Sequence, residues 1–288
     1  MEYNDDRTNP GVLKNEEKEI FKMKILKSFV LLLSGLMILV LQYSHAEEAL
    51  AVDEIVKKTN QTVYYQGQDG RAQVKMTIKD QQGNTREREF VILRRNMDDK
   101  NEEQNFYVYF KNPADVREMV FMVWKHIGKD DDRWMYLPAL DVVRQIASSD
   151  KRTSFVGSTF FYEDVSGRSL IEDNHELVET TENYFVVKNT PKNPASVEFD
   201  SFTMHIHKTT FVPVKVEFEK GGKVYRVSEA RKVETISGFP TVTQSSMKDL
   251  NSGTETTLDY LKVEYNVDIP DSIFTERFMR RAPRQYLE

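Results

Sequence analysis

After its first quarter, the chain consists of short runs in which apolar and polar residues alternate, separated by turn residues. In the first run, Val74, Met76 and Ile78 alternate with polar residues, residues 80–84 form a glycine-containing turn, and Arg86–Leu93 runs back. Successive side chains of a strand point to opposite faces. The pattern therefore predicts a β-hairpin with one buried and one solvated face.

The same alternation recurs to the end of the chain, with prolines and glycines marking the breaks. It predicts strands at Phe106–Phe110, Glu118–Trp124, Trp134–Leu137, Val142–Ile146, Tyr184–Val187, Phe202–His207, Val212–Phe218, Val224–Ser228, Val233–Ile236, Thr241–Met247 and Thr256–Val263. About a dozen short strands joined by tight turns build an antiparallel meander, so the expected class is mainly β, a sandwich or a barrel.

Two short segments outside the strands are expected to pack against the sheet. Glu47–Lys58 has acidic residues early and lysines late, which favours a helix. Its apolar stripe is narrow, so this helix must dock on another element to be stable. Near the other end, Phe274–Met279 is a short apolar segment that is expected to fold back onto the sheet.

The N-terminal part has the organisation of a secretory signal peptide at residues 23–46. Lys24 and Lys27 precede the apolar run Phe29–Leu41, and small residues precede a cleavage site between Ala46 and Glu47. A spanning helix needs about 20 apolar residues, so this run is short for an anchor. Residues 1–22 are polar and without apolar pattern, which predicts a non-native extension, with residues 47–288 as a single domain in the periplasm.

The charge and the cysteine content exclude several classes of protein. The net charge is −6 at pH 7, whereas a nucleic-acid-binding domain is expected to have a basic face. The chain has no cysteine, so an exported form has no disulfides and no acceptor thiol for a lipid anchor. The core alone must stabilise the domain.

Aromatic residues are concentrated between residues 133 and 168. Such side chains must be covered either by the protein's own core or by a ligand. The candidates for a hydrophobic ligand cavity are Trp134, Tyr136, Phe155, Phe160 and Tyr162, together with Phe121 and Phe202. By alternation, Trp134 and Tyr136 share one sheet face and Met135 and Leu137 share the other, and the alternation does not decide which face is concave.

Charged residues flank the aromatic segment. Lys151, Arg152 and Arg168 are either part of a solvated loop or contacts for anionic lipid headgroups or an acidic partner. His205 and His207 point to one side of a predicted strand, which is half of a possible metal site, but no third ligand is evident. We therefore predict no metal and no cofactor.

Motifs of catalysis are not evident in the sequence. Gly157-Ser158 lacks the G-x-S-x-G pattern of a nucleophile elbow. The neighbouring carboxylates Glu163 and Asp164 would point to opposite faces of a strand, which argues against a shared acid–base site. The sequence favours a binding protein and not an enzyme.

Three motifs together resemble those of a known family: Trp134-Met135-Tyr136-Leu137-Pro138, Ser148-Ser149-Asp150, and Gly157 to Asp164 (GSTFFYED). They resemble the W-x-Y-L-P, SS-D and G-S-D-F-x-Y-E-D signature of a branch of the LolA-like superfamily, the periplasmic outer-membrane lipoprotein-sorting proteins. Thr159 replaces the usual aspartate of this signature, and Phe161 replaces a residue that is often small and polar.

This resemblance implies a strongly curved, unclosed antiparallel β-barrel with a helical lid over its concave face. It further implies a monomeric, non-enzymatic periplasmic carrier that binds lipid or the acyl chains of lipoproteins and moves them between inner and outer membrane. The donor and acceptor would be membrane proteins, including an RND-type permease. The alternative is a sensor or accessory binding module of an inner-membrane exporter on the same scaffold.

Overall fold

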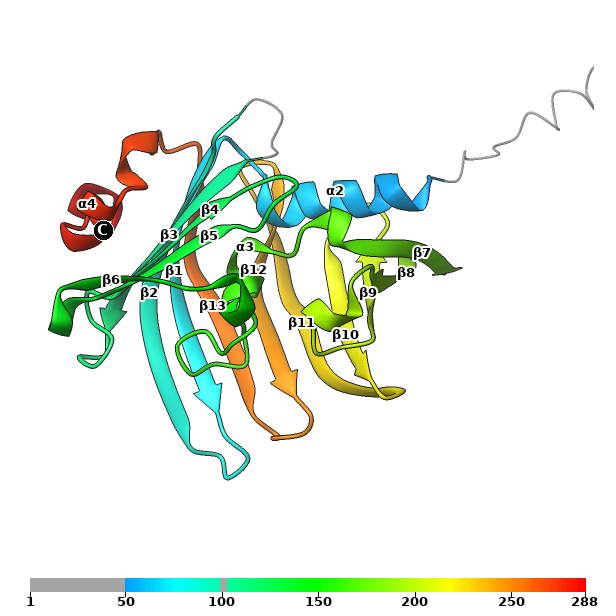
Figure 1. The fold of residues 1–288 in the computed structure, drawn as a ribbon. Helices are drawn as coiled ribbons and strands as arrows, with labels where there is room; N and C mark the ends of the chain where they lie inside the picture. The colour runs from blue at the N-terminus through cyan, green and yellow to red at the C-terminus, as the bar shows by residue number, and fades with distance from the viewer. Residues whose placement is uncertain (1–49, 99–102) are drawn as a thin grey trace, which may run out of the picture. The chain divides into compact units, whose positions relative to one another are not determined.

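The computed structural model describes residues 50–98 and 103–288. Its main feature is one 13-stranded antiparallel sheet, which is curved and not closed into a barrel (Figure 1). The strand order is β6-β5-β4-β3-β2-β1-β13-β12-β11-β10-β9-β8-β7. This arrangement confirms the prediction of a mainly β chain folded as an unclosed half-barrel.

The strands follow the alternating runs of the sequence closely. Their bounds are β1 (Asp69–Lys79), β2 (Thr85–Asn96), β3 (Gln104–Asn112), β4 (Val120–Lys125), β5 (Asp132–Leu137), β6 (Val142–Gln145), β7 (Asp173–Thr180), β8 (Tyr184–Pro191), β9 (Ser201–His207), β10 (Pro213–Lys220), β11 (Lys223–Ile236), β12 (Phe239–Asp249) and β13 (Glu255–Tyr265). Two details differ from expectation. The two runs at 224–236 form the single strand β11, and β7, rich in charged residues, is an additional edge strand.

The order of the strands dictates where the aromatic segment must lie. The sheet begins in its middle, where β1 pairs with β13, and strands β1 to β6 proceed to one edge. The chain must then reach the opposite edge, where β7 starts the return to the centre. Residues 146–172, which we call the crossover, make this connection, and Figure 1 shows their short helix α3 (Tyr162–Ser166) inside the curve of the sheet.

Helix α2 (Val52–Tyr64) lies across the strands at the β7–β12 side of the sheet (Figure 1). It buries Ile55, Val56 and Thr59. The expected helix at 47–58 is thus displaced toward the C-terminus, because the polar residues after Lys58 continue the helix when one of its faces packs on the sheet. The part of that prediction before residue 50, and the signal peptide, lie outside the described residues.

The concave face of β1 to β5 holds one apolar core, into which the crossover inserts Phe155. The Phe155 ring contacts Phe110 and Phe121, with centroids 5.8 and 5.5 Å apart, and also contacts Phe90. Four buried aromatic rings from three strands and the crossover therefore stabilise one another through tilted and edge-on contacts.

The convex face of the same strands is covered by the C-terminal segment, residues 267–288, which includes helix α4 (Glu276–Arg280) (Figure 1). Trp124 Nε1 donates to the Phe274 carbonyl at 3.0 Å, and the Tyr107 hydroxyl donates to the Phe278 carbonyl at 2.7 Å. In the described structure the apolar segment near residue 274 therefore does fold back onto the sheet. The sheet is consequently buried on both faces at this side.

Candidate functional site

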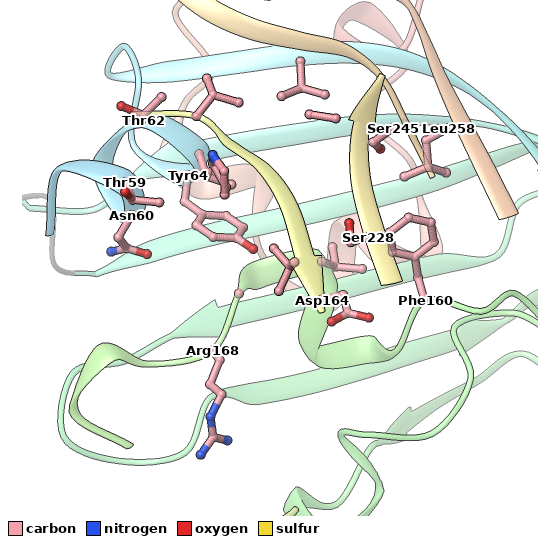
Figure 2. Close-up of a pocket in the computed structure, with 18 of the residues that line it drawn as sticks. Thr59, Asn60, Thr62, Tyr64, Phe160, Asp164, Arg168, Ser228, Ser245 and Leu258 are labelled. Carbon is pink, nitrogen blue, oxygen red and sulfur yellow. The ribbon is translucent and has the colours of Figure 1, made fainter. Parts of the chain in front are cut away.

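A cavity of about 440 Å³ lies on the concave side of the sheet, between the strands, α2 and the crossover. Figure 2 shows residues of all three parts around it, among them Tyr64 of α2, Phe160 of the crossover and Leu258 of β13. Its volume is within the range of about 300–1,000 Å³ that is usual for small-molecule sites.

Most of the lining is apolar and comes from the inward-facing positions of the strands. The aliphatic and aromatic side chains include Met76, Phe90, Ile92, Val108, Met204, Val216, Phe218, Met247, Leu258 and Tyr260. Three of the seven aromatic residues predicted to line a cavity are among the lining residues: Phe155, Phe160 and Phe202. Such a surface favours an apolar ligand, because burying apolar area yields about 25 cal/mol per Å².

The other four predicted aromatic residues do not line the cavity. Phe121 and Tyr162 pack on Phe155 in the core of the concave face, with ring centroids 5.2 Å apart from each other. Trp134 and Tyr136 lie on the convex face, against the C-terminal segment. The hypothesis that the Trp134 face lines the cavity is therefore wrong, because Met135 on the opposite face points to the concave core.

The crossover is fixed in place by a buried cluster of ion pairs around Glu163, whose side chain is 3% exposed. Lys151 Nζ lies 3.3 Å from Glu163 Oε1, Arg168 Nη1 lies 3.7 Å from the same oxygen, and Arg152 donates to Oε2. Burial opposes ionisation, but these cations together keep the pKa of Glu163 below its usual value. One carboxylate thus joins three cations of the crossover.

The same cations have further carboxylate partners. Arg152 forms a two-pronged pair with Glu198 at 2.6 and 2.7 Å, and Arg168 forms one with Asp173 at 2.9 and 3.1 Å. Burial raises the pKa of Glu198, but the pair with Arg152 outweighs this and lowers it to about 2. The interpretation of Lys151, Arg152 and Arg168 as a solvated loop is thus wrong, because these groups bind carboxylates of the protein; their contact with lipid headgroups or an acidic partner stays a prediction.

Glu163 and Asp164 belong to the first turn of α3, and both have structural partners. Asp164 accepts the Phe161 N–H at 2.7 Å at the start of the helix and pairs with Arg226. The Arg226 guanidinium also lies 3.9 Å from the centre of the Phe161 ring, a favourable cation–π geometry. Phe161, one of the two residues that depart from the resembled signature, therefore covers the buried Arg226.

Helix α2 and the crossover meet at Tyr64. Its ring packs on Gly167, where an added Cβ would lie 2.4 Å from a ring atom. Beneath them, the buried Lys125 Nζ donates to the Gly167 carbonyl at 3.3 Å and lies 4.9 Å from the centre of the Tyr64 ring. Gly167 is needed here both for this close approach and for its φ of +76°.

Burial of Lys125 predicts a pH-dependent stability. Desolvation lowers the pKa of Lys125 from 10.5 to about 8. Between these values the unfolded chain binds more protons than the folded protein, so the free energy of unfolding should rise with pH. We expect the free energy of unfolding, measured in urea, to rise by about 1–3 kcal/mol from pH ~7 to ~10. The variant Lys125→Met should not show this rise. Lys220→Met, at the exposed last residue of β10, should keep the rise; an equal slope in Lys125→Met would contradict the assignment.

At the end of the cavity near Gln66, which follows α2, the lining is polar. Arg94 lines the cavity there, with Tyr265 and Thr241, whose hydroxyls are 2.9 Å apart. The sequence reasoning missed Arg94, although the signal was present: it continues the inward-facing series Phe90, Ile92 along β2. A charged residue at an inward position of an alternating strand is the feature that would have found it.

The two histidines of β9 are partnered within the protein. His205 Nε2 lies 3.3 Å from Glu217 Oε2, and His207 Nδ1 lies 3.2 Å from the Thr210 hydroxyl. Within residues 50–98 and 103–288, no group of three His, Cys, Asp or Glu side chains is arranged to hold a metal ion. None of the helices in this described part has the length and apolar character needed to span a bilayer.

Solved structures share this architecture over nearly their whole length. A DUF1329 family protein from Desulfovibrio piger is 24% identical, with a TM-score of 0.71 and coverage of 78% of this chain and 96% of that one. A Vibrio parahaemolyticus domain described as outer membrane lipoprotein-sorting is 23% identical (TM-score 0.71; 79% and 97% covered). A LolA superfamily protein from Nitrosomonas europaea is 21% identical (TM-score 0.62; 80% and 100% covered).

These likenesses establish that the chain has the LolA-superfamily fold. No curated protein matches the sequence. A family model with the description "Uncharacterized protein" matches residues 102–281, which is more than half of the chain. The chain therefore belongs to the family that this model describes, and it has the fold of the solved LolA superfamily protein.

Proposed function

We propose that the protein is a periplasmic carrier that binds lipid, or the acyl chains of a lipoprotein, in the concave cavity and moves them between the inner and outer membrane. The observation that carries the proposal is the apolar cavity of about 440 Å³ beneath α2 and the crossover. Transfer of an acyl chain from water stabilises the complex by about 0.8 kcal/mol per CH₂. A cavity of this kind needs no chemical step to hold its cargo, so we propose a non-enzymatic function.

Release of the cargo requires that part of the cover moves. The cover consists of α2 and the crossover, which contact each other at Tyr64 and Gly167. The sheet itself is one continuous set of antiparallel pairs, so moving α2 costs fewer interactions than separating strands. We propose that α2 moves away for loading and returns to exclude water from the bound chain.

Native mass spectrometry of the protein from a periplasmic extract, with lipid extraction of the same sample, tests this proposal. A bound phospholipid or acylated peptide is the expected result and would begin to identify the cargo. A mass equal to that of the protein alone, unchanged after lipid is offered, would contradict the carrier function. It would favour the alternative of an accessory module that contacts only proteins, such as an RND-type exporter.

Filling the cavity should abolish uptake without unfolding the protein. Ser228 of β11 lines the cavity and is labelled in Figure 2. We expect Ser228→Trp to reduce binding of a radiolabelled fatty acid by about tenfold or more, because the indole occupies the volume of the chain, with overpacking costing about 1–3 kcal/mol of stability. Ser149→Trp, at an exposed serine of the crossover, is the matched control and should bind normally. Equal binding by both variants would place the ligand elsewhere.

The carrier proposal includes export and processing of the chain. We propose that residues 23–46 are a signal peptide that is removed between Ala46 and Glu47, that residues 1–22 are not part of the natural protein, and that residues 47–288 form the working domain. The intact mass of the protein recovered from the periplasm measures this directly. A mass that includes the apolar run Phe29–Leu41 would contradict cleavage and indicate an anchored protein.

A further inference from the structure

Arg94 differs from the other arginines that line the cavity. Arg152 pairs with Glu198 and Arg168 pairs with Asp173. Among the described residues, in contrast, no carboxylate lies within ion-pair distance of Arg94. Its hydrogen-bond acceptors are neutral: Asn96 Oδ1 at 3.2 Å and the Gln66 carbonyl.

The guanidinium of Arg94 is deep in the protein but faces the cavity. It lines the cavity and is partly exposed to it, and burial lowers the pKa of Arg94 to about 10. The group is still a cation at neutral pH. A guanidinium has five N–H donors, so the two bonds to neutral acceptors leave donors for a further partner. Asp69 acts on this buried cation electrostatically but does not pair with it directly, so an anionic ligand would supply the direct partner that the guanidinium lacks.

The position of Arg94 relative to the apolar lining fits an amphiphile. Phe90, Ile92 and Arg94 line the cavity from successive inward positions of β2. Because a strand rises about 3.3 Å per residue, the segment of β2 from Arg94 to Phe90 lines the cavity over a length of roughly 13 Å. We call this lining segment the floor of the cavity. Met76 and Phe160 continue the apolar lining. One end of the cavity is thus cationic and its floor is apolar.

We propose that Arg94 binds the anionic head of a single-chain amphiphile, a carboxylate or a phosphate monoester, whose alkyl chain lies along the floor of the cavity. This inference rests on the proposed function and specifies its ligand class. Arg94 is well suited because its planar fork donates two parallel hydrogen bonds to a carboxylate or phosphate.

The test compares three ligands with equal alkyl chains on the delipidated protein: hexadecanol, hexadecanoate and hexadecyl phosphate, each displacing the neutral dye Nile red near neutral pH. We expect at least one anion to bind about tenfold tighter than the alcohol, which equals about 1.4 kcal/mol. Preference for the phosphate points to a lipid headgroup as the source, and preference for the carboxylate to a free fatty acid.

The variant Arg94→Gln should lose the preference for anions while its affinity for hexadecanol stays within about twofold, because the floor of the cavity is unchanged. Arg94→Lys should keep part of the preference. The control is Arg71→Gln, which removes an arginine that pairs with Glu264 and lies against Tyr286 of the C-terminal segment on the convex face; it should keep the full preference.

Three results separate the possible failures. If wild-type protein binds none of the three ligands, the proposed carrier function itself fails. If it binds the alcohol and the anions equally well, only the role of Arg94 is overturned, and this comparison holds even if Arg94→Gln does not fold. If Arg94→Gln keeps the preference for anions, another group binds the head and the inference is wrong.

Discussion

Deletion of residues 269–288 is expected to make the protein insoluble or unfolded. These residues contribute Ile269, Ile273, Phe274, Met279 and Leu287 to the core of the convex face, each at most 4% exposed. Burial of one such side chain contributes about 1.5–3 kcal/mol, whereas a whole domain is stable by about 5–15 kcal/mol. The soluble fraction after expression, and circular dichroism of any soluble protein, measure the effect.

A single substitution within this segment measures how much one of its buried side chains contributes to stability. Phe274→Ala should lower the free energy of unfolding by about 3–5 kcal/mol, since it removes a fully buried ring. The matched control is Arg280→Ala in the same segment, whose pairs with Asp141 and Glu276 are solvent-exposed and should contribute less than about 1 kcal/mol. A soluble deletion protein with normal thermal unfolding would show that the convex face needs no cover.

Replacing Glu163 by glutamine is expected to destabilise the protein by about 1–3 kcal/mol, since the buried cluster loses its central carboxylate while each cation keeps a second carboxylate partner. In wild type, Lys151, Arg152 and Arg168 all lie around this carboxylate. Glutamine has nearly the same shape, so the loss measures charge and not packing. Urea unfolding of the variant measures it, and binding of a fatty acid tests whether the crossover still covers the cavity.

The pH dependence of this effect has a defined sign. The pKa of Glu163 is depressed in the folded protein, so its contribution is present above its unfolded pKa of about 4.5 and is lost as pH falls through the folded pKa. Wild type and Glu163→Gln should therefore converge in stability at acidic pH. Asp130→Asn is the control: Asp130 pairs with Lys151 at 3.3 Å but is 55% exposed, and should cost less than about 1 kcal/mol. Equal losses in the two variants would contradict a special role for Glu163.

The positions of the strands, and which residues of a strand share a face, could be predicted from the sequence, because the alternation depends on neighbouring residues alone. Trp134 and Tyr136 do share a face, and Met135 lies on the other. Which face is concave could not be predicted. Both faces of β5 are apolar because the C-terminal segment covers one and the crossover the other, and that information lies far away in the sequence.

The ion-pair partners of the buried cationic residues could not be predicted from the sequence either, because they also lie far away along the chain. Arg152 forms an ion pair with Glu198, and Asp164 forms one with Arg226. These residues are far apart in the sequence, and the alternation of apolar and polar residues carries no information on such distant pairs. Only the strand order brings them together. Arg94 is different, since its inward position follows from the alternation of β2 alone, and a search for charged residues at apolar positions would have identified it.

The crossover also limits the shape that the sheet can adopt. It begins at one free edge of the sheet, after β6, and ends at the other, before β7, while the buried cluster around Glu163 fixes it in between. The two edges are thus joined by a segment of fixed length, and the sheet cannot flatten without stretching that segment. The width of the cavity is therefore set by a connection that belongs to no strand. The length of this connection is the quantity through which related chains could acquire wider or narrower cavities.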